Sequence, residues 1–226
     1  MIDAGDPAEQ AARYEAQGAD EIILLDIDAT PKAKDTQLDT VRRVRRVLGI
    51  PLTVGGGVRT VDDARALLAA GADKVSVNSA AVARPALISE LAEAFGRQCV
   101  VLAIDARRDG DGWAVLVRGG RESVPGLEAV AWARTGETLG AGEVLLTSWD
   151  RDGTREGCDV ELLRAARAAV RLPVIASGGI GTRAHVADAV AAGADAVLAA
   201  SLLHYDLDTV GAVKSDLAGR GVVVRQ

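Results

Sequence analysis

The chain has 226 residues, 49% of them hydrophobic, and a formal net charge of −6 at neutral pH. A mildly acidic composition carries no electrostatic footprint for nucleic acid, and no apolar run approaches the roughly 18 residues that cross a bilayer. The first residues also lack the basic and apolar regions of a signal peptide, so we expect a cytoplasmic protein whose partners include neither nucleic acid nor membrane.

The cysteine and histidine residues give little indication of a metal site or of redox chemistry. The two cysteines, Cys99 and Cys158, and the two histidines, His185 and His204, are widely separated in the chain. Neither pair has the spacing of a metal site or a redox motif, and no disulfide framework is implied. We therefore expect no metal and no organic cofactor.

Short β-branched runs alternate with alanine-rich amphipathic stretches along the whole chain. Seven segments are predicted as strands: 21–26, 52–55, 74–78, 99–105, 143–149, 174–177 and 196–200. Helix-period segments accompany them at 7–17, 61–70, 85–95, 160–170 and 184–192. Continuous apolar strands that alternate with helices predict a parallel sheet, here an α/β protein of the (β/α)8, TIM-barrel type. Since no linker interrupts the pattern, we expect residues 1–226 to form a single domain.

The chain also repeats itself at a fixed offset. The run PLTVGGGV from residue 51 aligns with PVIASGGI from residue 173, an offset of 173 − 51 = 122 residues. The same offset aligns the Gly-Ala-Asp turns at 71–73 and 193–195, which suit the end of a helix before a strand. The repeat predicts two related half-barrels.

The number of predicted strands is one short of a closed eight-stranded barrel. The chain opens with a helix rather than a strand, and Asp6 and Pro7 form a good N-cap and first helical residue. We therefore expect the first strand of the barrel to be missing at the N-terminus, and Met1 to be an internal methionine of a longer natural protein.

Glycine-rich turns follow two of the predicted strands. Gly55 ends the segment 52–55, Gly56 and Gly57 follow it, and Gly178 and Gly179 follow its repeat partner. Glycine lets backbone N–H groups approach an anion closely, and a following helix N-terminus favours negative charge. On their own, Gly55 and Gly56 indicate only a tight turn. Together with polar residues at 78–79 and 201, the two turns predict two phosphate sites and hence a bisphosphate ligand.

Carboxylates lie at the ends of three predicted strands. Asp105 ends the long apolar segment 99–105, and we expect it to act in general acid–base catalysis. For Asp26, Asp28, Asp150 and Asp152, the prediction is loop structure or substrate positioning.

Three charged residues begin strands at the opposite end of the predicted barrel. Glu21, Lys74 and Glu143 each follow a Gly-Ala-Asp or Gly-Ala-Gly turn. Charges at the bottom of a barrel are costly unless they are paired or hydrated. An interior ion ring that gates a solvent path and a set of individual surface ion pairs fit this pattern equally well.

The run LLTSWDRDGT at 145–154 is the most specific feature of the chain. With LDI at 25–27, GGGV at 55–58, DKVSVN at 73–78, AID at 103–105 and AAS at 199–201, it resembles the cyclase subunit of imidazole glycerol phosphate synthase. The resemblance implies a lyase of histidine biosynthesis. Such an enzyme converts phosphoribulosyl-formimino aminoimidazole carboxamide ribotide, a bisphosphate, and ammonia into imidazole glycerol phosphate and aminoimidazole carboxamide ribotide. It also implies a glutaminase subunit that docks on the barrel bottom and supplies ammonia through the interior.

The resemblance also assigns roles to residues by position. Asp105 matches one of two catalytic aspartates, and Asp73 lies where the glutaminase docks. The residues matched to phosphate or substrate binding are Gly57, Asn78, Ser79, Thr147, Asp152, Gly178, Gly179 and Ser201. Those matched to the ammonia entrance are Glu21, Lys74 and Glu143.

The sequence departs from the family pattern in two places. The other catalytic aspartate, a nearby lysine and a fourth charge of the ammonia entrance belong to the first strand and its loop, which this sequence lacks. Ser-Val-Pro-Gly at 123–126 replaces a threonine–glycine turn near the substrate, and proline removes an N–H donor. Two alternatives therefore stay open: the sister sugar-phosphate isomerase, which needs no ammonia, and a non-catalytic phosphate-binding remnant.

Overall fold

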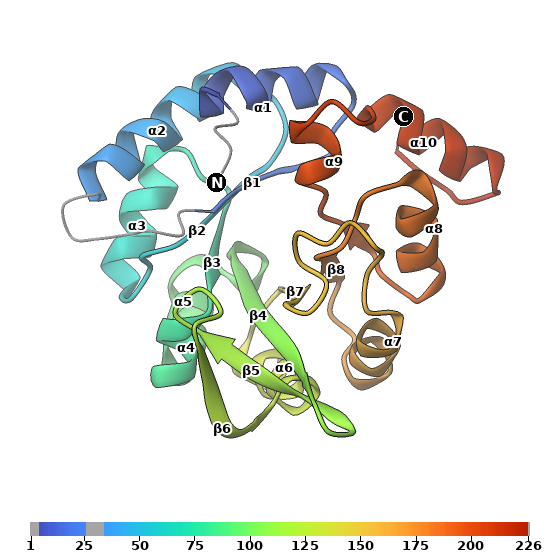
Figure 1. Ribbon diagram of the computed structural model, residues 1–226. Helices are drawn as coiled ribbons and strands as arrows, with labels where there is room; N and C mark the ends of the chain where they lie inside the picture. Colours follow the sequence, from blue (N-terminus) through green and yellow to red (C-terminus); the bar gives the residue numbers. More distant parts are fainter. Residues whose placement is uncertain (1–4, 26–33, 226) are drawn as a thin grey trace.

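The computed structural model describes residues 5–25 and 34–225. Its strands are β1 (Ile22–Leu25), β2 (Leu52–Gly55), β3 (Lys74–Val77), β4 (Val100–Asp109), β5 (Gly112–Val117), β6 (Glu122–Glu128), β7 (Glu143–Ser148), β8 (Val174–Ser177) and β9 (Ala196–Val197). They form one curled sheet, in which the order β1-β2-β3-β4-β7-β8-β9 is parallel throughout (Figure 1). β5 and β6 continue antiparallel from β4.

Helices surround the convex face of this sheet (Figure 1). They are α1 (Pro7–Ala16), α2 (Lys34–Val47), α3 (Val61–Ala70), α4 (Ser79–Ala83), α5 (Ala86–Phe95), α6 (Ala129–Leu139), α7 (Val160–Ala169), α8 (Arg183–Ala191), α9 (Ser201–His204) and α10 (Val210–Gly219), with a 3-10 turn η2 (Arg97–Cys99) before β4. The predicted fold class, a parallel α/β sheet of TIM-barrel type, is confirmed. Among residues 5–25 and 34–225, none of the helices combines the length and the apolar character that spanning a bilayer requires.

The two halves of the sheet repeat each other in local geometry. Thr60 and Thr182, which lie 122 positions apart, are both N-caps whose side chains accept the N–H of the third residue of the next helix. The glycines that follow these helices, Gly71 and Gly193, both have left-handed backbones, with φ values of 117° and 103°. Short-range capping and turn signals thus produce the same β-α-β unit twice.

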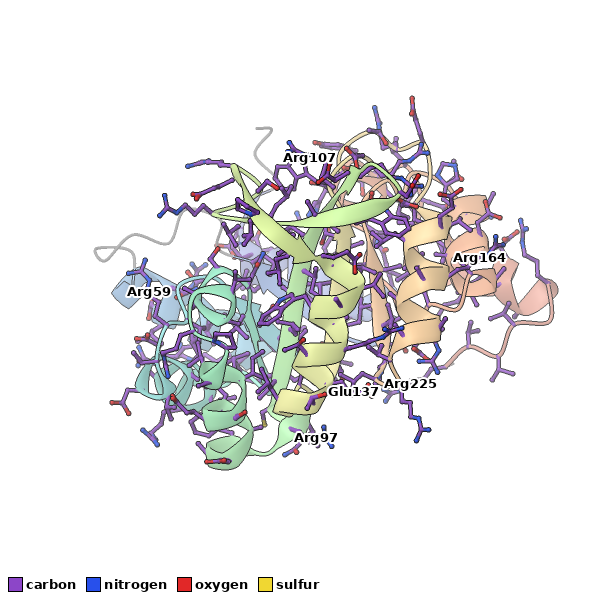
Figure 2. All side chains as sticks on the ribbon, turned by 90° about the horizontal axis from the view of Figure 1, so that it is seen from below. Arg59, Arg97, Arg107, Glu137, Arg164 and Arg225 are labelled. Atoms are coloured by element: carbon purple, nitrogen blue, oxygen red, sulfur yellow. The ribbon has the colours of Figure 1, made fainter. Side chains whose placement is uncertain are left out.

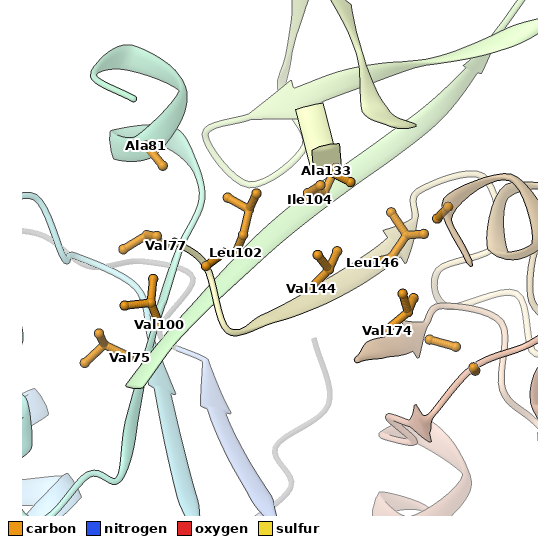
Figure 3. Packing of buried hydrophobic residues seen from close by; sticks show 14 of the residues in the cluster. Val75, Val77, Ala81, Val100, Leu102, Ile104, Ala133, Val144, Leu146 and Val174 are labelled. Atoms are coloured by element: carbon orange, nitrogen blue, oxygen red, sulfur yellow. The ribbon is translucent and has the colours of Figure 1, made fainter. Parts of the chain in front are cut away.

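Apolar side chains fill the layer between sheet and helices. Val75, Leu102, Leu146 and Val174 project from four neighbouring strands toward this layer, where they meet residues such as Ala133 of α6 (Figure 3). All of these side chains are nearly inaccessible to solvent. This layer is the main core, and it fixes the positions of the strand ends.

A smaller apolar cluster occupies the concave face of the sheet. Side chains alternate between the two faces of a strand, so Val101 faces inward where Leu102 faces outward. The cluster consists of Val101, Leu145 and Ile175, with Ile23, Ala103 and Leu198 packed against it. It forms an apolar floor beneath the carboxyl ends of the strands.

The sheet is open between β1 and β9, since no ladder joins these two strands within the described residues. The helices nevertheless meet across this gap. The hydroxyl of Tyr14 in α1 lies 2.5 Å from Nδ1 of His204 in α9, and Arg13 Nη1 lies 2.7 Å from Asp206 Oδ1. Lys214 Nζ of α10 donates to Asp20 Oδ1 at 2.8 Å. We call these contacts the helix seam; they join residues between 190 and 194 positions apart.

The sequence-based prediction misses the hairpin of β5 and β6. The predicted strand 99–105 continues to Asp109, and the chain then turns back antiparallel. Trp113 of β5 is 8% exposed, and its Nε1 donates to Asp159, the N-cap of α7, at 2.8 Å. Pro125 lies in β6, which among the described strands pairs with β5 alone and so tolerates a residue without an N–H.

Candidate functional site

Polar residues of three neighbouring strands form a row at the carboxyl ends of the sheet. Asp105 of β4 pairs in register with Thr147 of β7, which pairs with Ser177 of β8. Leu145 and Ile175, two residues earlier, belong to the interior cluster, so the row faces the inside of the curl. This is the end of a barrel sheet at which active sites lie.

Asp105 has the environment of an acid–base group. Asn78, at the end of β3, donates its Nδ2 to Asp105 Oδ2 at 3.0 Å. Burial raises the pKa of Asp105 to about 6, and the negative charge of Asp152 adds to the rise, while the hydrogen bond from Asn78 opposes it. A carboxyl group with this pKa can both give and take a proton near neutral pH.

Asn78 also presents an unused acceptor. Its Oδ1 is buried without a hydrogen-bond partner among the described residues. A buried polar atom in this state is costly, and it is satisfied when a ligand supplies an N–H or O–H. The side chain of Asn78 thus forms a direct hydrogen bond to Asp105. The sequence predicted Asn78 only as a phosphate ligand.

The first glycine turn, after β2, has the backbone that an anion site needs. Gly56 and Gly57 have φ values of 102° and 72°, which L-residues with side chains rarely adopt. At the end of the next strand, Ser79 Oγ accepts the backbone N–H of Arg118 at 2.8 Å. This contact leaves the hydroxyl hydrogen of Ser79 free to donate to a ligand.

The second glycine turn, after β8, opens into a pocket. Gly178 and Gly179 have φ values of 93° and 83°. The pocket is lined by both glycines together with Asp152 and Ser201, so four of the predicted binding residues meet here. A Cβ on Gly179 would lie 2.1 Å from the carbonyl oxygen of Gly157, which excludes any side chain at this position.

Charged residues form a cluster at the opposite end of the sheet. Lys74 Nζ lies 2.8 Å from Glu21 Oε2 and 2.7 Å from Glu143 Oε1. Thr53, which is fully buried, donates its hydroxyl to Glu21. Burial lowers the pKa of Lys74, but hydrogen bonds to Glu143 and Glu21 outweigh it, so the pKa is raised overall. The three predicted residues are therefore one linked cluster and not separate surface ion pairs.

The other aspartates singled out in the sequence lie at different places in the structure. Asp150 Oδ2 accepts the backbone N–H of Arg108 at 2.7 Å, the loop-structuring contact that the sequence predicts. Asp73 is exposed at the end of the sheet that carries Lys74. Asp26 and Asp28 lie outside the described residues.

Two arginines at the mouth are absent from the predicted site. Arg118 and Arg155 have φ values of 54° and 59°, uncommon for residues with side chains. The backbone N–H of Arg118 binds Ser79, and Arg155 lines the pocket of the second glycine turn. The only signal in the sequence is the glycines that surround both positions.

The fold and the site together define a class: an α/β protein of TIM-barrel type whose acid–base and turn residues gather at the carboxyl ends of parallel strands. The model of the family described as "Histidine biosynthesis protein" matches residues 1–209. The chain belongs to this family.

Two relatives share the name imidazole glycerol phosphate synthase subunit HisF. The protein from Mycobacteroides abscessus is 56% identical over 232 residues, which cover 100% of this chain and 90% of the relative. The protein from Acidobacterium capsulatum is 55% identical over 226 residues, which cover 100% of this chain and 89% of the relative. The resemblance found in the sequence is therefore confirmed.

Proposed function

We propose that the chain is the cyclase subunit of an imidazole glycerol phosphate synthase. It condenses ammonia with phosphoribulosyl-formimino aminoimidazole carboxamide ribotide and releases imidazole glycerol phosphate and aminoimidazole carboxamide ribotide. The observation that carries the proposal is Asp105, a carboxyl group with a pKa of about 6 in the polar row at the mouth. Two relatives that are named as subunits of this synthase support it.

The order of the strands supports a substrate with a phosphate at each end. One glycine turn follows β2 and the other follows β8, and β4 and β7 lie between them in the sheet. A bisphosphate held at both turns would pass over Asp105 and Thr147. Asp105 then transfers protons between the attacking nitrogen and the leaving group, since its pKa suits both directions.

The residues on the concave face of the sheet suggest a route for ammonia from one end of the strands to the other. The cluster of Glu21, Lys74 and Glu143 lies at the amino-terminal ends of the strands, where a glutaminase subunit would dock. The interior apolar cluster lies between these charges and the row that contains Asp105. Neutral ammonia crosses an apolar layer more readily than ammonium does, so this arrangement would deliver the nucleophilic form.

We place the reaction in the cytoplasm. Cys99 and Cys158 are both free thiols, and free thiols without a disulfide are usual in a reducing compartment.

Ammonium-dependent turnover of the ribotide by the purified chain tests the proposal. The expected result is the release of both products in equal amounts, at a rate that rises with ammonium concentration. Isomerisation of a ribotide without ammonia would instead identify the sister isomerase. Binding of the ribotide without turnover, with or without ammonium, would identify a phosphate-binding remnant.

A further inference from the structure

One arginine lies in the pocket of the second glycine turn. The loop that joins β7 to α7 runs beside β8 (Figure 1), and its residue Arg155 lines this pocket with Gly178, Gly179 and Ser201. Among the lining residues that the structure describes, Arg155 is the only cation. The other charged residue of the lining is an aspartate, Asp152, which repels an anion.

The backbone of Arg155 is held in place by its surroundings. Its φ of 59° lies in the left-handed region, which residues with a Cβ adopt only when the surrounding structure imposes it. A Cβ on Gly181 would lie 2.5 Å from the Cβ of Arg155 and 2.7 Å from its carbonyl oxygen, so the two segments are in direct contact. Such an unfavourable conformation at a pocket is typical of a functional position.

The guanidinium group of Arg155 forms no ion pair within the described part of the protein. Its neighbour Arg151 lies 4.0 Å from Glu156, whereas no carboxylate lies within ion-pair distance of Arg155 in the described ranges. A guanidinium group beside backbone N–H donors is suited to a phosphate, because it offers several donors in a planar fork.

We propose that Arg155 binds the phosphate group of the ligand at the second glycine turn, and that its charge makes this site selective for the phosphate dianion. Gly178, Gly179 and Ser201 supply neutral donors, and Arg155 supplies the charge that offsets both the phosphate and Asp152. The inference rests on the proposed function, and it assigns to the second site a charged side-chain contact. Arg155 binds and orients the ligand, and it takes no part in proton transfer.

The test uses three substitutions of Arg155 in the full chain. Arg155→Lys keeps a positive charge but not the planar fork. Arg155→Asn removes the charge with a residue that tolerates a positive φ, and Arg155→Gly removes the charge while it relieves the backbone. The matched control is Arg164→Gln, which removes the charge of an exposed arginine on α7, away from the pocket lining (Figure 2).

Inorganic phosphate is the probe, and its dissociation constant is measured at pH 8 from the amide chemical shifts of Gly178 and Gly179. We expect Arg155→Asn and Arg155→Gly to weaken binding about tenfold, the usual effect of one charged hydrogen bond. Arg155→Lys should stay within about threefold of the parent, and Arg164→Gln should not change. In the parent, binding should weaken as the pH falls and the dianion is protonated; Arg155→Gly should lose most of that dependence.

Equal phosphate affinity in the parent and Arg155→Gly would overturn the inference, and so would an equal loss in the Arg164→Gln control. Because Arg155→Gly relieves a strained backbone, it is expected to fold, and its melting temperature verifies this. The titration needs no turnover. A chain that fails to convert the ribotide but shows the phosphate effect would contradict the proposed function alone, and an active chain without the effect would contradict this inference alone.

Discussion

Asp73 and Asp195, which lie 122 residues apart, make the same backbone contact. Asp73 Oδ2 accepts the N–H of Leu52 at 2.8 Å, and Asp195 Oδ2 accepts that of Val174 at 2.9 Å. Each carboxylate also faces an arginine 28 positions earlier, at 3.0 Å and 3.5 Å. Their side chains are similarly exposed, at 50% and 45%. The protein therefore contains an internal structural control for Asp73.

Alanine substitutions at these two positions separate partner docking from stability. Asp73→Ala and Asp195→Ala should lower the free energy of unfolding by similar amounts, about 1 kcal/mol, since each removes one acceptor from a backbone N–H. Only Asp73→Ala should also lower glutamine-dependent turnover, measured with the glutaminase subunit, relative to ammonium-dependent turnover. An equal loss of coupling in both variants would remove Asp73 from the docking surface.

The parallel part of the fold could be predicted because its signals are local. Apolar runs of four to seven residues stand between glycine turns and capped helices, and all seven parallel strands occur where they were expected. The hairpin of β5 and β6 was missed because Arg107 and Arg108 form a polar, exposed end of β4 that reads as a loop. Gly110-Asp111 was the available signal, since it forms the two-residue loop between the paired residues Asp109 and Gly112, and Gly-Asp is a common hairpin turn.

Replacement of Asp105 by asparagine should strongly reduce the catalytic rate without abolishing binding. Asparagine keeps the shape and can still accept the hydrogen bond from Asn78, but it cannot transfer a proton. We expect ammonium-dependent kcat to fall by about a hundredfold or more, with the affinity for imidazole glycerol phosphate changed by less than about threefold. Turnover near the parent rate would show that Asp105 is not the acid–base group.

The same variant should reveal a pH-dependent cost of burying Asp105. Its pKa is raised from 3.8 to about 6, so the protonated form is favoured by folding. The stabilising contribution is present below pH 3.8 and is lost as the pH rises through about 6. The stability of the parent relative to Asp105→Asn should therefore fall by about 2 kcal/mol between pH 4 and pH 8. Urea unfolding of both proteins across this range measures the difference, and parallel curves would contradict it.

Removal of Lys74 should harm the protein more than removal of the whole charge cluster. Lys74→Met leaves the carboxylates of Glu21 and Glu143 close together and largely enclosed, so we expect a loss of about 2 kcal/mol in the free energy of unfolding. The triple variant Glu21→Gln, Lys74→Met, Glu143→Gln should recover about half of this loss or more. A triple variant less stable than Lys74→Met would show that the three charges do not act as one cluster.

The helix seam should contribute measurably to stability through Tyr14. Tyr14→Phe keeps the buried ring but removes the hydroxyl that contacts His204, so the free energy of unfolding should fall by about 1 kcal/mol. Tyr205→Phe is the control, because Tyr205 is 44% exposed and should be neutral. Equal stability of the two variants would mean that the hydroxyl contact contributes nothing.

The site could be predicted in part. Asp105 and the glycine turns follow from strand ends and composition, because carboxyl ends of parallel strands meet at one edge. The contact of Asn78 with Asp105 could not be predicted, since it depends on how two strand ends come together in the curled sheet. Arg155 could not be predicted for a similar reason. Its place in the pocket depends on a left-handed backbone conformation, which arginine rarely adopts.

The helix seam also bears on how the chain folds during synthesis. Arg13 and Tyr14 are synthesised long before their partners at 203–206, which lie 190 to 193 positions later in the chain. At about 5–20 residues per second, α1 waits on the order of ten seconds or more before these partners exist. Contacts so distant in sequence form slowly, so the face of α1 that carries Arg13 and Tyr14 stays without these partners until the segment 203–206 has been made. A chaperone that recognises exposed helix faces could therefore bind α1 during this interval.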